Sequence, residues 1–403
     1  MKRALAIACV GFWLPLAQGA EDLARQVQLE DLGRALFFDV NLSRDRTQSC
    51  ATCHDPARAF TDWRDSGVNA AASLGDDQLS LGDRNAPTAS YASLTPDFHR
   101  DAQGEYVGGQ FWDGRAATLD AQAGGPPLNA MEMGQPDAAA VVARLQENPN
   151  YQHVFPRLFG AEIFNEVDAA YAAMTQALAA FERTDFFSPF DSRYDRYLRG
   201  EYTPTEQEAL GMTLFFSNQF TNCNACHQLQ AFPEAEGETF TNYRYRNIGV
   251  PVNRQLREAN GLGETFVDPG LRNNPLAADD ETTAGRFRVP TLRNVALTSP
   301  YMHNGVFSGL DTVVRFYNKF LARGSKAQIN PETGEPWGEP EIADNLALDE
   351  LEQGSALDER RIDALVAFMR MLTDKRYETL LEAREAATRQ AETLAEIEPA
   401  AAP

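Results

Sequence analysis

Apolar residues recur at helical spacing in several separate stretches of this sequence. Leu29, Leu32 and Leu36 follow one another at intervals of three and four residues. A longer stripe is formed by Ile362, Leu365, Val366, Met369 and Leu372. Strict alternation of apolar and polar residues, which marks half-buried strands, is nearly absent. The pattern predicts an all-α protein with long loops, and such loops are uncommon unless they wrap something, so we expect a large ligand buried in each half.

The predicted helices occur in two matching sets. The string L-G-x-x-L-F-F begins at Leu32 and returns at Leu210, and "ALAAFER" from Ala177 is matched by "ALVAFMR" from Ala364. A fixed order of elements that occurs twice indicates an internal duplication. The second set is predicted to start with Thr203 as the N-cap, followed by Pro204 and the capping-box acid Glu206. We predict a signal peptide over residues 1–20, domains over 21–197 and 198–376, and an exposed helical tail over 377–403.

The N-terminus has the pattern of a secretory signal peptide. Lys2 and Arg3 precede a short apolar run from Ala4 to Leu16, and small residues follow, with cleavage expected after Gly19 or Ala20. No later stretch reaches the ~20 apolar residues that a membrane-spanning helix needs. The sequence therefore predicts an exported, periplasmic protein without a membrane span.

Charge narrows the choice of partners. The formal net charge of the chain is -22 at pH 7. Binding to nucleic acid or to anionic lipid relies on Lys and Arg, so this charge argues against both as partners. A basic redox protein or a small neutral oxidant fits this charge better.

Two C-x-x-C-H motifs carry the chemistry. They consist of Cys50, Cys53 and His54 in the first half and of Cys223, Cys226 and His227 in the second. Two thiols at this spacing attach to the vinyl groups of a haem, and the adjacent imidazole reaches the iron. A disulfide gives no reason for the His, and a zinc site needs ligands beyond the Cys that remain after export. We predict two covalently bound haem c groups, with His54 and His227 as proximal ligands.

Few residues are left to bind the opposite face of each iron. The chain has 5 His in all, so besides the two proximal ligands only His99, His153 and His303 remain. Met is the usual partner in carrier cytochromes. Candidates for the second haem are Met302, Met369 and Met371, although Met369 continues the helical stripe and core packing explains it better.

Several strings together resemble the bacterial di-haem cytochrome c peroxidases and their MauG-like branch. They are "LGRALFFDVNLSRDRTQSCATCHDPARAFTD", "NAPT", "FWDGRAATLDAQA", "MEMG", "CNACH" and "RFRVPTLRNVALTSPYMHNG". The resemblance implies two class I cytochrome c-like domains, each wrapping one haem, with peroxide reacting at the N-terminal one. It also implies roles for Trp112 as an electron relay between the haems and for Gln122 and Glu132 on the peroxide face.

The resemblance further implies a calcium ion between the domains and a second-haem neighbour that is not an iron ligand. The calcium positions correspond to Asn85, Thr298 and Pro300, and the neighbour corresponds to His303. Each residue also has a structural alternative: Trp112 as a core aromatic, Asn85 as a turn residue and Glu132 as a solvated helix charge.

Two departures from the ordinary peroxidase pattern matter for function. The loop "SLGDDQLSLGDRNAPT" contains no His that could cap the peroxide iron, and Asp77 stands near the expected place. The sixth ligand of the second haem is ordinarily a Met 14 positions after the His that corresponds to His303, and here that position is Tyr317. Tyr at this position is the MauG-like feature, and an anionic phenolate stabilises higher iron oxidation states than a thioether does. The alternative is that Tyr317 packs a helix from Leu310 to Phe320.

The predicted function is a hydrogen peroxide-dependent oxidation of a partner protein. The alternatives are a cytochrome c peroxidase that receives electrons from a small cytochrome or copper protein, and a di-haem electron carrier. In one enzyme of the MauG-like branch, a surface Trp two residues before the second motif receives electrons from its substrate, methylamine dehydrogenase, and Thr221 at this position counts against that substrate here. Trp63 and Trp337 are other possible exits, the latter in a loop expected to be solvated.

Overall fold

The computed structural model describes residues 14–397 and is mostly helical, with 44% helix and 7% strand. The all-α prediction is therefore confirmed, while much of the predicted signal peptide lies outside the described residues. The helices are α1 (Leu14–Phe37), α2 (Cys50–Cys53), α3 (Leu119–Ala123), α4 (Ala138–Glu147), α5 (Pro149–Phe159), α6 (Val167–Glu182), α7 (Arg193–Leu198), α8 (Glu206–Phe215), α9 (Arg254–Ala259), α10 (Leu310–Leu321), α11 (Leu348–Leu351), α12 (Glu359–Met371) and α13 (Glu378–Ile397).

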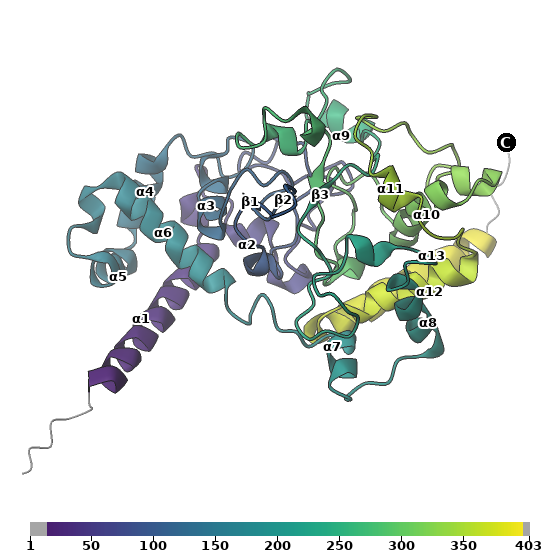
Figure 1. Cartoon of the computed structure of the whole chain (residues 1–403). Helices are drawn as coiled ribbons and strands as arrows, with labels where there is room; N and C mark the ends of the chain where they lie inside the picture. Colours follow the sequence, from purple (N-terminus) through teal and green to yellow (C-terminus); the bar gives the residue numbers. More distant parts are fainter. Residues whose placement is uncertain (1–13, 398–403) are drawn as a thin grey trace, which may run out of the picture.

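The strands of the described part of the chain form two small two-stranded antiparallel sheets, and isolated β-bridges lie outside them. β1 (His99–Arg100) pairs with β2 (Tyr106–Val107), and β3 (Tyr245–Arg246) pairs with β4 (Phe287–Arg288). Long loops with short 3-10 helices connect these elements. Figure 1 shows the loops and the short strands in the middle of the molecule, between two groups of helices.

The duplicated strings form two equivalent helix pairs, α1 with α6 and α8 with α12 (Figure 1). The repeated glycine marks the contact in each pair. A Cβ at Gly33 would lie 1.8 Å from the carbonyl oxygen of Ala177, and one at Gly211 would lie 1.8 Å from that of Ala364. No side chain fits at such a distance, so the glycines allow the helix backbones to approach closely. This contact explains why the same two strings occur twice.

Each helix pair contributes to its own hydrophobic core. The first core extends from Leu32 to Phe187 and the second from Tyr194 to Leu372. Smaller clusters join residues that are distant in sequence, such as Ala59 with Leu297. The proposed division near residue 198 stays a prediction, and it is compatible with this distribution of cores.

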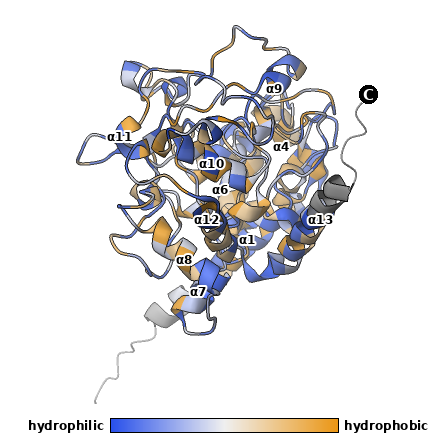
Figure 2. Cartoon of the chain, turned by 90° about the vertical axis from the view of Figure 1, so that its right-hand side faces the viewer, coloured by the Kyte–Doolittle hydropathy of each residue, from blue (hydrophilic) through white to orange (hydrophobic). Residues whose placement is uncertain are grey.

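Two local predictions need correction. The N-cap of α8 is Thr205, which forms a capping box with Glu208, so the predicted start at Thr203 and Glu206 was two residues early. The C-terminal helix α13 is present and mostly hydrophilic in Figure 2, but it is not fully exposed. Its Leu381 is 5% exposed and packs with Ala59 and Leu297. Among the described residues, no helix has the length and apolarity required to cross a membrane.

Candidate functional site

The first C-x-x-C-H motif borders a large cavity. Ser49 and Thr52 form a capping box that begins the short helix α2, and this turn carries Cys50 and Cys53. Both cysteines and His54 line a cavity of about 700 Å³. The two thiols are free rather than joined in a disulfide. The geometry suits attachment of a large flat ligand beside the imidazole.

The second motif borders a smaller cavity. Cys223, Cys226 and His227 line a space of about 230 Å³, and these two thiols are also free. Burial raises the pKa of all four thiols, to about 11 for Cys226. No group of three or more His, Cys, Asp or Glu residues in the described part of the chain is arranged to hold a metal ion. The zinc alternative therefore lacks a ligand set there.

Both motif histidines are held in the same way. The Nδ1 atom of His54 lies 3.2 Å from the carbonyl oxygen of Phe60, and that of His227 lies 3.1 Å from the carbonyl oxygen of Phe240. A hydrogen bond from Nδ1 to a carbonyl fixes the tautomer and leaves Nε2 as the metal-binding atom. Burial lowers the pKa of both histidines, to about 4 for His227, which favours the neutral form that metal coordination requires.

Arg288 provides the test of whether the cavities suit haem. It lines both cavities, and its guanidinium donates only long hydrogen bonds, 3.4 Å to the Phe111 carbonyl and 3.3 Å to the Thr95 hydroxyl. No carboxylate of the described residues forms an ion pair with it, and burial lowers its pKa. A buried cation requires a counter-charge. The carboxylate groups of a haem would supply one, so these residues fit the cofactor.

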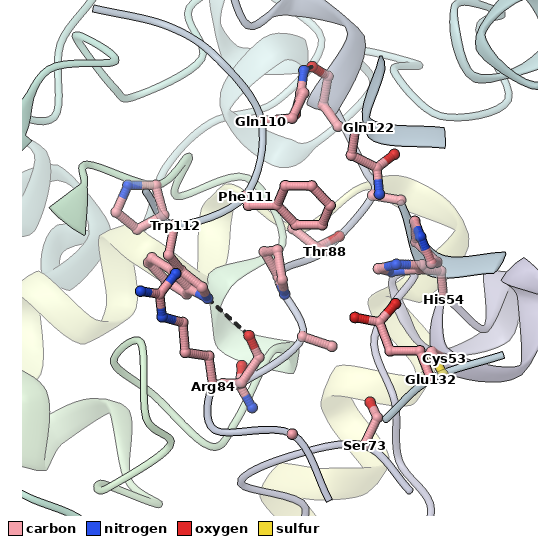
Figure 3. Close-up of a pocket in the computed structure, with 18 of the residues that line it drawn as sticks. Cys53, His54, Ser73, Arg84, Thr88, Gln110, Phe111, Trp112, Gln122 and Glu132 are labelled. Carbon is pink, nitrogen blue, oxygen red and sulfur yellow. Dashed lines mark hydrogen bonds between the residues drawn. The ribbon is translucent and has the colours of Figure 1, made fainter. Parts of the chain in front are cut away.

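The predicted peroxide-face residues lie together in the first cavity. Figure 3 shows Glu132 and Gln122 at the same end of this cavity as His54. The Oε1 atom of Glu132 accepts a hydrogen bond of 2.8 Å from Asn129 Nδ2, and burial raises the pKa of this carboxyl above its usual range. Gln122 is carried by the short helix α3, which the side chain of Thr118 caps. Glu132 is therefore a cavity residue rather than a solvated helix charge.

Trp112 lies between the two cavities and lines both of them. Its Nε1 donates a hydrogen bond of 2.8 Å to the carbonyl oxygen of Asn85, drawn as a dashed line in Figure 3. Its own carbonyl accepts a hydrogen bond of 2.8 Å from the backbone N–H of Arg288. The indole is thus fixed at the boundary of the two sites, where an electron relay would have to be.

Tyr317 lies on α10 and lines the second cavity. Its side chain therefore does more than pack the helix, which was the alternative interpretation. Burial raises the pKa of its phenol. Met302 and Met369 line the same cavity, whereas Met371 is fully buried elsewhere in the core. Neither His99 nor His153 lines either cavity, so the structure gives no support to these histidines as iron ligands.

His303 also lines the second cavity, with its ring stacked on Phe287 at a centroid distance of 3.6 Å. Its Nε2 has no hydrogen-bond partner among the described residues, and burial lowers its pKa to about 3.

The three candidate calcium residues, Asn85, Thr298 and Pro300, all line the first cavity. The side-chain amide of Asn85 donates to the carbonyl oxygens of Ala70 and Ala71, at 3.3 and 3.4 Å.

Other residues singled out in the sequence lie outside the cavities. Asp77 accepts hydrogen bonds from Leu79 and Ser80 in its own turn, which lowers its pKa to about 2, and it does not line the first cavity. The loop around Trp337 is exposed over residues 331–336, as expected of a solvated loop, whereas the indole of Trp337 itself is half-buried against Phe307 and Phe316.

Sequence reasoning missed two buried ionisable residues of the first cavity. One is Arg288, and the other is Glu182 at the end of α6, which is 6% exposed. Burial raises the pKa of Glu182 to about 8. Both stand inside strings that had been noted for other reasons, "RFRVPTLRN" and "ALAAFER". A charged residue within an otherwise apolar repeated helix was the available signal for Glu182.

Comparison with known proteins agrees with this arrangement. The family model for the di-haem cytochrome c peroxidases matches residues 27–203. The chain is 54% identical over 389 residues to the methylamine utilization protein MauG of Paracoccus denitrificans, covering 96% of this chain and 99% of that protein. Among solved structures, the di-haem peroxidase BthA of Burkholderia thailandensis has a TM-score of 0.76 at 31% identity, covering 87% of this chain and 86% of that one. A MauG-like protein associated with microbial copper homeostasis has a TM-score of 0.62 at 29% identity, covering 86% and 90% of the respective chains. The chain belongs to the di-haem cytochrome c peroxidase family.

Proposed function

We propose that this di-haem peroxidase is exported to the periplasm and uses hydrogen peroxide to oxidise a partner protein. As a MauG-like member of its family, it carries two haem c groups. The observation that carries the proposal is the position of Tyr317 in the second cavity, together with the first cavity's lack of a lining His other than His54. An oxygen ligand at one iron and a free face at the other suit an enzyme that holds oxidising equivalents instead of passing electrons in a steady stream.

The residues of the first cavity have defined roles in this proposal. His54 and His227 would hold the irons from the proximal side, and the bound haems would supply the redox chemistry. Glu132 accepts a proton from one peroxide oxygen and returns it to the other, so that water can leave. Gln122 orients the peroxide by hydrogen bonding. Asn129 holds the Glu132 carboxyl in place at 2.8 Å.

Trp112 and Arg288 are assigned to electron transfer between the two haem sites. The indole of Trp112 borders both cavities and offers a path for electrons from the second site to the first. Arg288 places a buried positive charge beside both sites, where it neutralises haem carboxylates. Both residues are therefore assigned to coupling between the haems.

The test compares how the peroxide-oxidised protein behaves without an electron donor and with one. The oxidised protein is mixed with one equivalent of peroxide and followed by stopped-flow absorbance, first alone and then with a reduced small basic cytochrome c. A two-electron-oxidised state that persists for minutes, with slow reduction by the cytochrome, supports oxidation of a partner protein. Rapid turnover with the cytochrome would show instead the second candidate, a peroxide-detoxifying cytochrome c peroxidase, which the net charge of -22 also favours.

For the partner protein we propose only a chemical class. The relative from Paracoccus denitrificans is named for methylamine utilization. In this chain Thr221 occupies the position two residues before the second motif, and its hydroxyl donates to the Leu214 carbonyl at 2.6 Å. Threonine cannot pass electrons as an indole can, so we propose a partner other than methylamine dehydrogenase, with an oxidisable side chain on its surface.

We also propose a calcium ion at Asn85, Thr298 and Pro300. Asparagine and backbone carbonyl oxygens are ligands that calcium accepts. The amide nitrogen of Asn85 is engaged with two carbonyls, which leaves its Oδ1 as the atom to meet a cation. Dialysis against a chelator should change the spectrum of the holoprotein and lower its melting temperature, and added calcium should restore both. Asn85→Ala should remove this response, and a chelator without effect on the starting protein would refute the site.

A further inference from the structure

Trp63 is an exposed indole with an unusual partner. Its side chain is 55% exposed, and its Nε1 donates a hydrogen bond of 2.8 Å to the Oδ2 atom of Asp55. Asp55 directly follows His54 in the chain. One hydrogen bond, followed by the Asp55 side chain and the peptide bond to His54, therefore connects the exposed indole to the predicted proximal ligand of the first haem.

The segment around Trp63 is fixed against the first motif by further contacts. The Phe60 carbonyl lies 3.2 Å from His54 Nδ1, and Arg64 Nη2 lies 3.4 Å from the sulfur of Cys53. The Oδ1 atom of Asp55 accepts a hydrogen bond of 2.8 Å from the backbone N–H of Ala57. The carboxylate is thus held by two donors, and the indole has a defined position relative to the motif.

We propose that Trp63 and Asp55 form a surface relay that delivers electrons from the partner protein to the first haem. This inference rests on the proposed reaction of peroxide at the first cavity. Trp63 gives one electron to the oxidised site and regains one from the partner, with no bond to hydrogen broken. Two such passages supply the two electrons that, with two protons from solvent, reduce one hydrogen peroxide to two waters.

The charges around the indole indicate how the relay works. The carboxylate of Asp55 at 2.8 Å stabilises the positive charge that Trp63 acquires when it loses an electron. The guanidinium of Arg58 lies 5.2 Å from the ring centroid and opposes this charge. Because the positive charge of Arg58 disfavours the oxidised indole, the stability of oxidised Trp63 depends on the negative charge of Asp55.

The other described tryptophans do not combine an exposed indole with a carboxylate partner, as Trp63 does. Trp112 is an internal residue that borders both cavities. Trp337 donates to the backbone carbonyl of Ala327 at 2.9 Å and has no carboxylate partner in the hydrogen bonds of the described residues. It is half-buried, so Trp337 is a suitable internal control for damage by peroxide alone.

The experiment detects oxidised Trp63 under conditions in which no electron donor can reduce it again. Holoprotein is treated with a few equivalents of peroxide without an electron donor, and peptide mass spectrometry measures oxygen added to Trp63 and Trp337. With no donor, the oxidised indole reacts with water, so that a C–H bond is replaced by C–OH and the electrons released reduce the peroxide. A parallel sample in which cyanide blocks the open haem gives the background of direct oxidation.

We expect the amount of oxygen added to Trp63 to be well above the amount added to Trp337. We expect the oxygen addition to Trp63 to disappear when cyanide is present. Asp55→Asn keeps the size of the side chain and removes its charge, and we expect it to lower Trp63 oxidation about tenfold, as for loss of one charge-assisted hydrogen bond. Trp337→Phe should leave Trp63 oxidation unchanged. Oxidation of Trp63 that is insensitive to cyanide or to Asp55→Asn overturns the relay.

Peroxide consumption in the same samples separates the two proposals. If peroxide is consumed and Trp63 stays unmodified, the relay alone is refuted. If the holoprotein consumes no peroxide, the proposed function fails and the relay fails with it.

Discussion

The substitution Glu132→Gln tests the proposed proton transfer directly. Glutamine has the same shape, and its Oε1 can still accept the 2.8 Å hydrogen bond from Asn129, so the cavity should keep its structure. What disappears is the carboxylate that accepts a proton. General acid–base catalysis contributes about 10²–10⁴-fold to a rate, equivalent to about 3–5 kcal/mol of transition-state stabilisation. We expect the second-order rate constant for the reaction with peroxide to fall by a factor in this range.

Stopped-flow absorbance at several pH values provides the assay. Burial raises the pKa of Glu132, and only the ionised carboxyl accepts a proton. The rate for the unmodified protein should therefore fall as the pH drops through that raised pKa, and the rate for Glu132→Gln should not vary in this window. Asp77→Asn is the matched control, because this carboxylate is engaged in its own turn outside the cavity. A Glu132→Gln rate within about threefold of the unmodified protein, far below the contribution expected of a general base, would refute the role.

Three further substitutions test the rest of the site and the fold. Tyr317→Phe should change the low-spin absorption spectrum of the second haem, because the phenolic oxygen is lost from its cavity; an unchanged spectrum would contradict the ligand assignment. Arg288→Met should lower the reduction potentials of both haems in spectroelectrochemical titration, because a buried positive charge beside both sites favours the reduced irons, while Arg288→Lys should restore part of the shift. Gly211→Ala should destabilise the protein by about 1–3 kcal/mol or more in denaturant unfolding, because its Cβ would lie 1.8 Å from the Ala364 carbonyl oxygen. Gly324→Ala, where a Cβ meets nothing within 4 Å, should have little effect, and equal losses in both variants would refute the packing argument.

The fold could be predicted as far as local pattern and repetition determine it. The repeated string predicted α1 and α8, and the structure gives the reason for its glycine: a position without a side chain is needed where two helix backbones touch, as at Gly33 and Gly211. Helix starts were less certain, since Thr203 and Thr205 both precede an acid at capping-box spacing. The structure selects Thr205 because its side chain accepts from the backbone N–H of Glu208.

Site residues could be predicted where a motif fixes their role, and not where tertiary contacts do. The thiols and imidazoles follow from C-x-x-C-H spacing alone. Arg288 gave no such signal, because its importance comes from the pairing of β4 with the distant β3 and from its position in the lining of both cavities. Trp337 shows a further limit: the Pro- and Gly-rich loop is exposed as expected, but its sequence gave no sign that the indole packs on Phe307 and Phe316. Packing across distant segments is invisible to local composition.

The positions of the tryptophans bear on how this enzyme reaches its partner. Trp112 connects the two cavities internally, but an internal relay cannot by itself exchange electrons with another protein. At the second motif the corresponding position is Thr221, which is half-buried and has no accessible redox chemistry. At the first motif Trp63 is exposed and bonded to the residue that follows the proximal histidine. If electrons enter on that side, the partner docks near the peroxide-reactive haem, and Trp112 then serves to share oxidising equivalents with the second haem instead of carrying every electron from the surface.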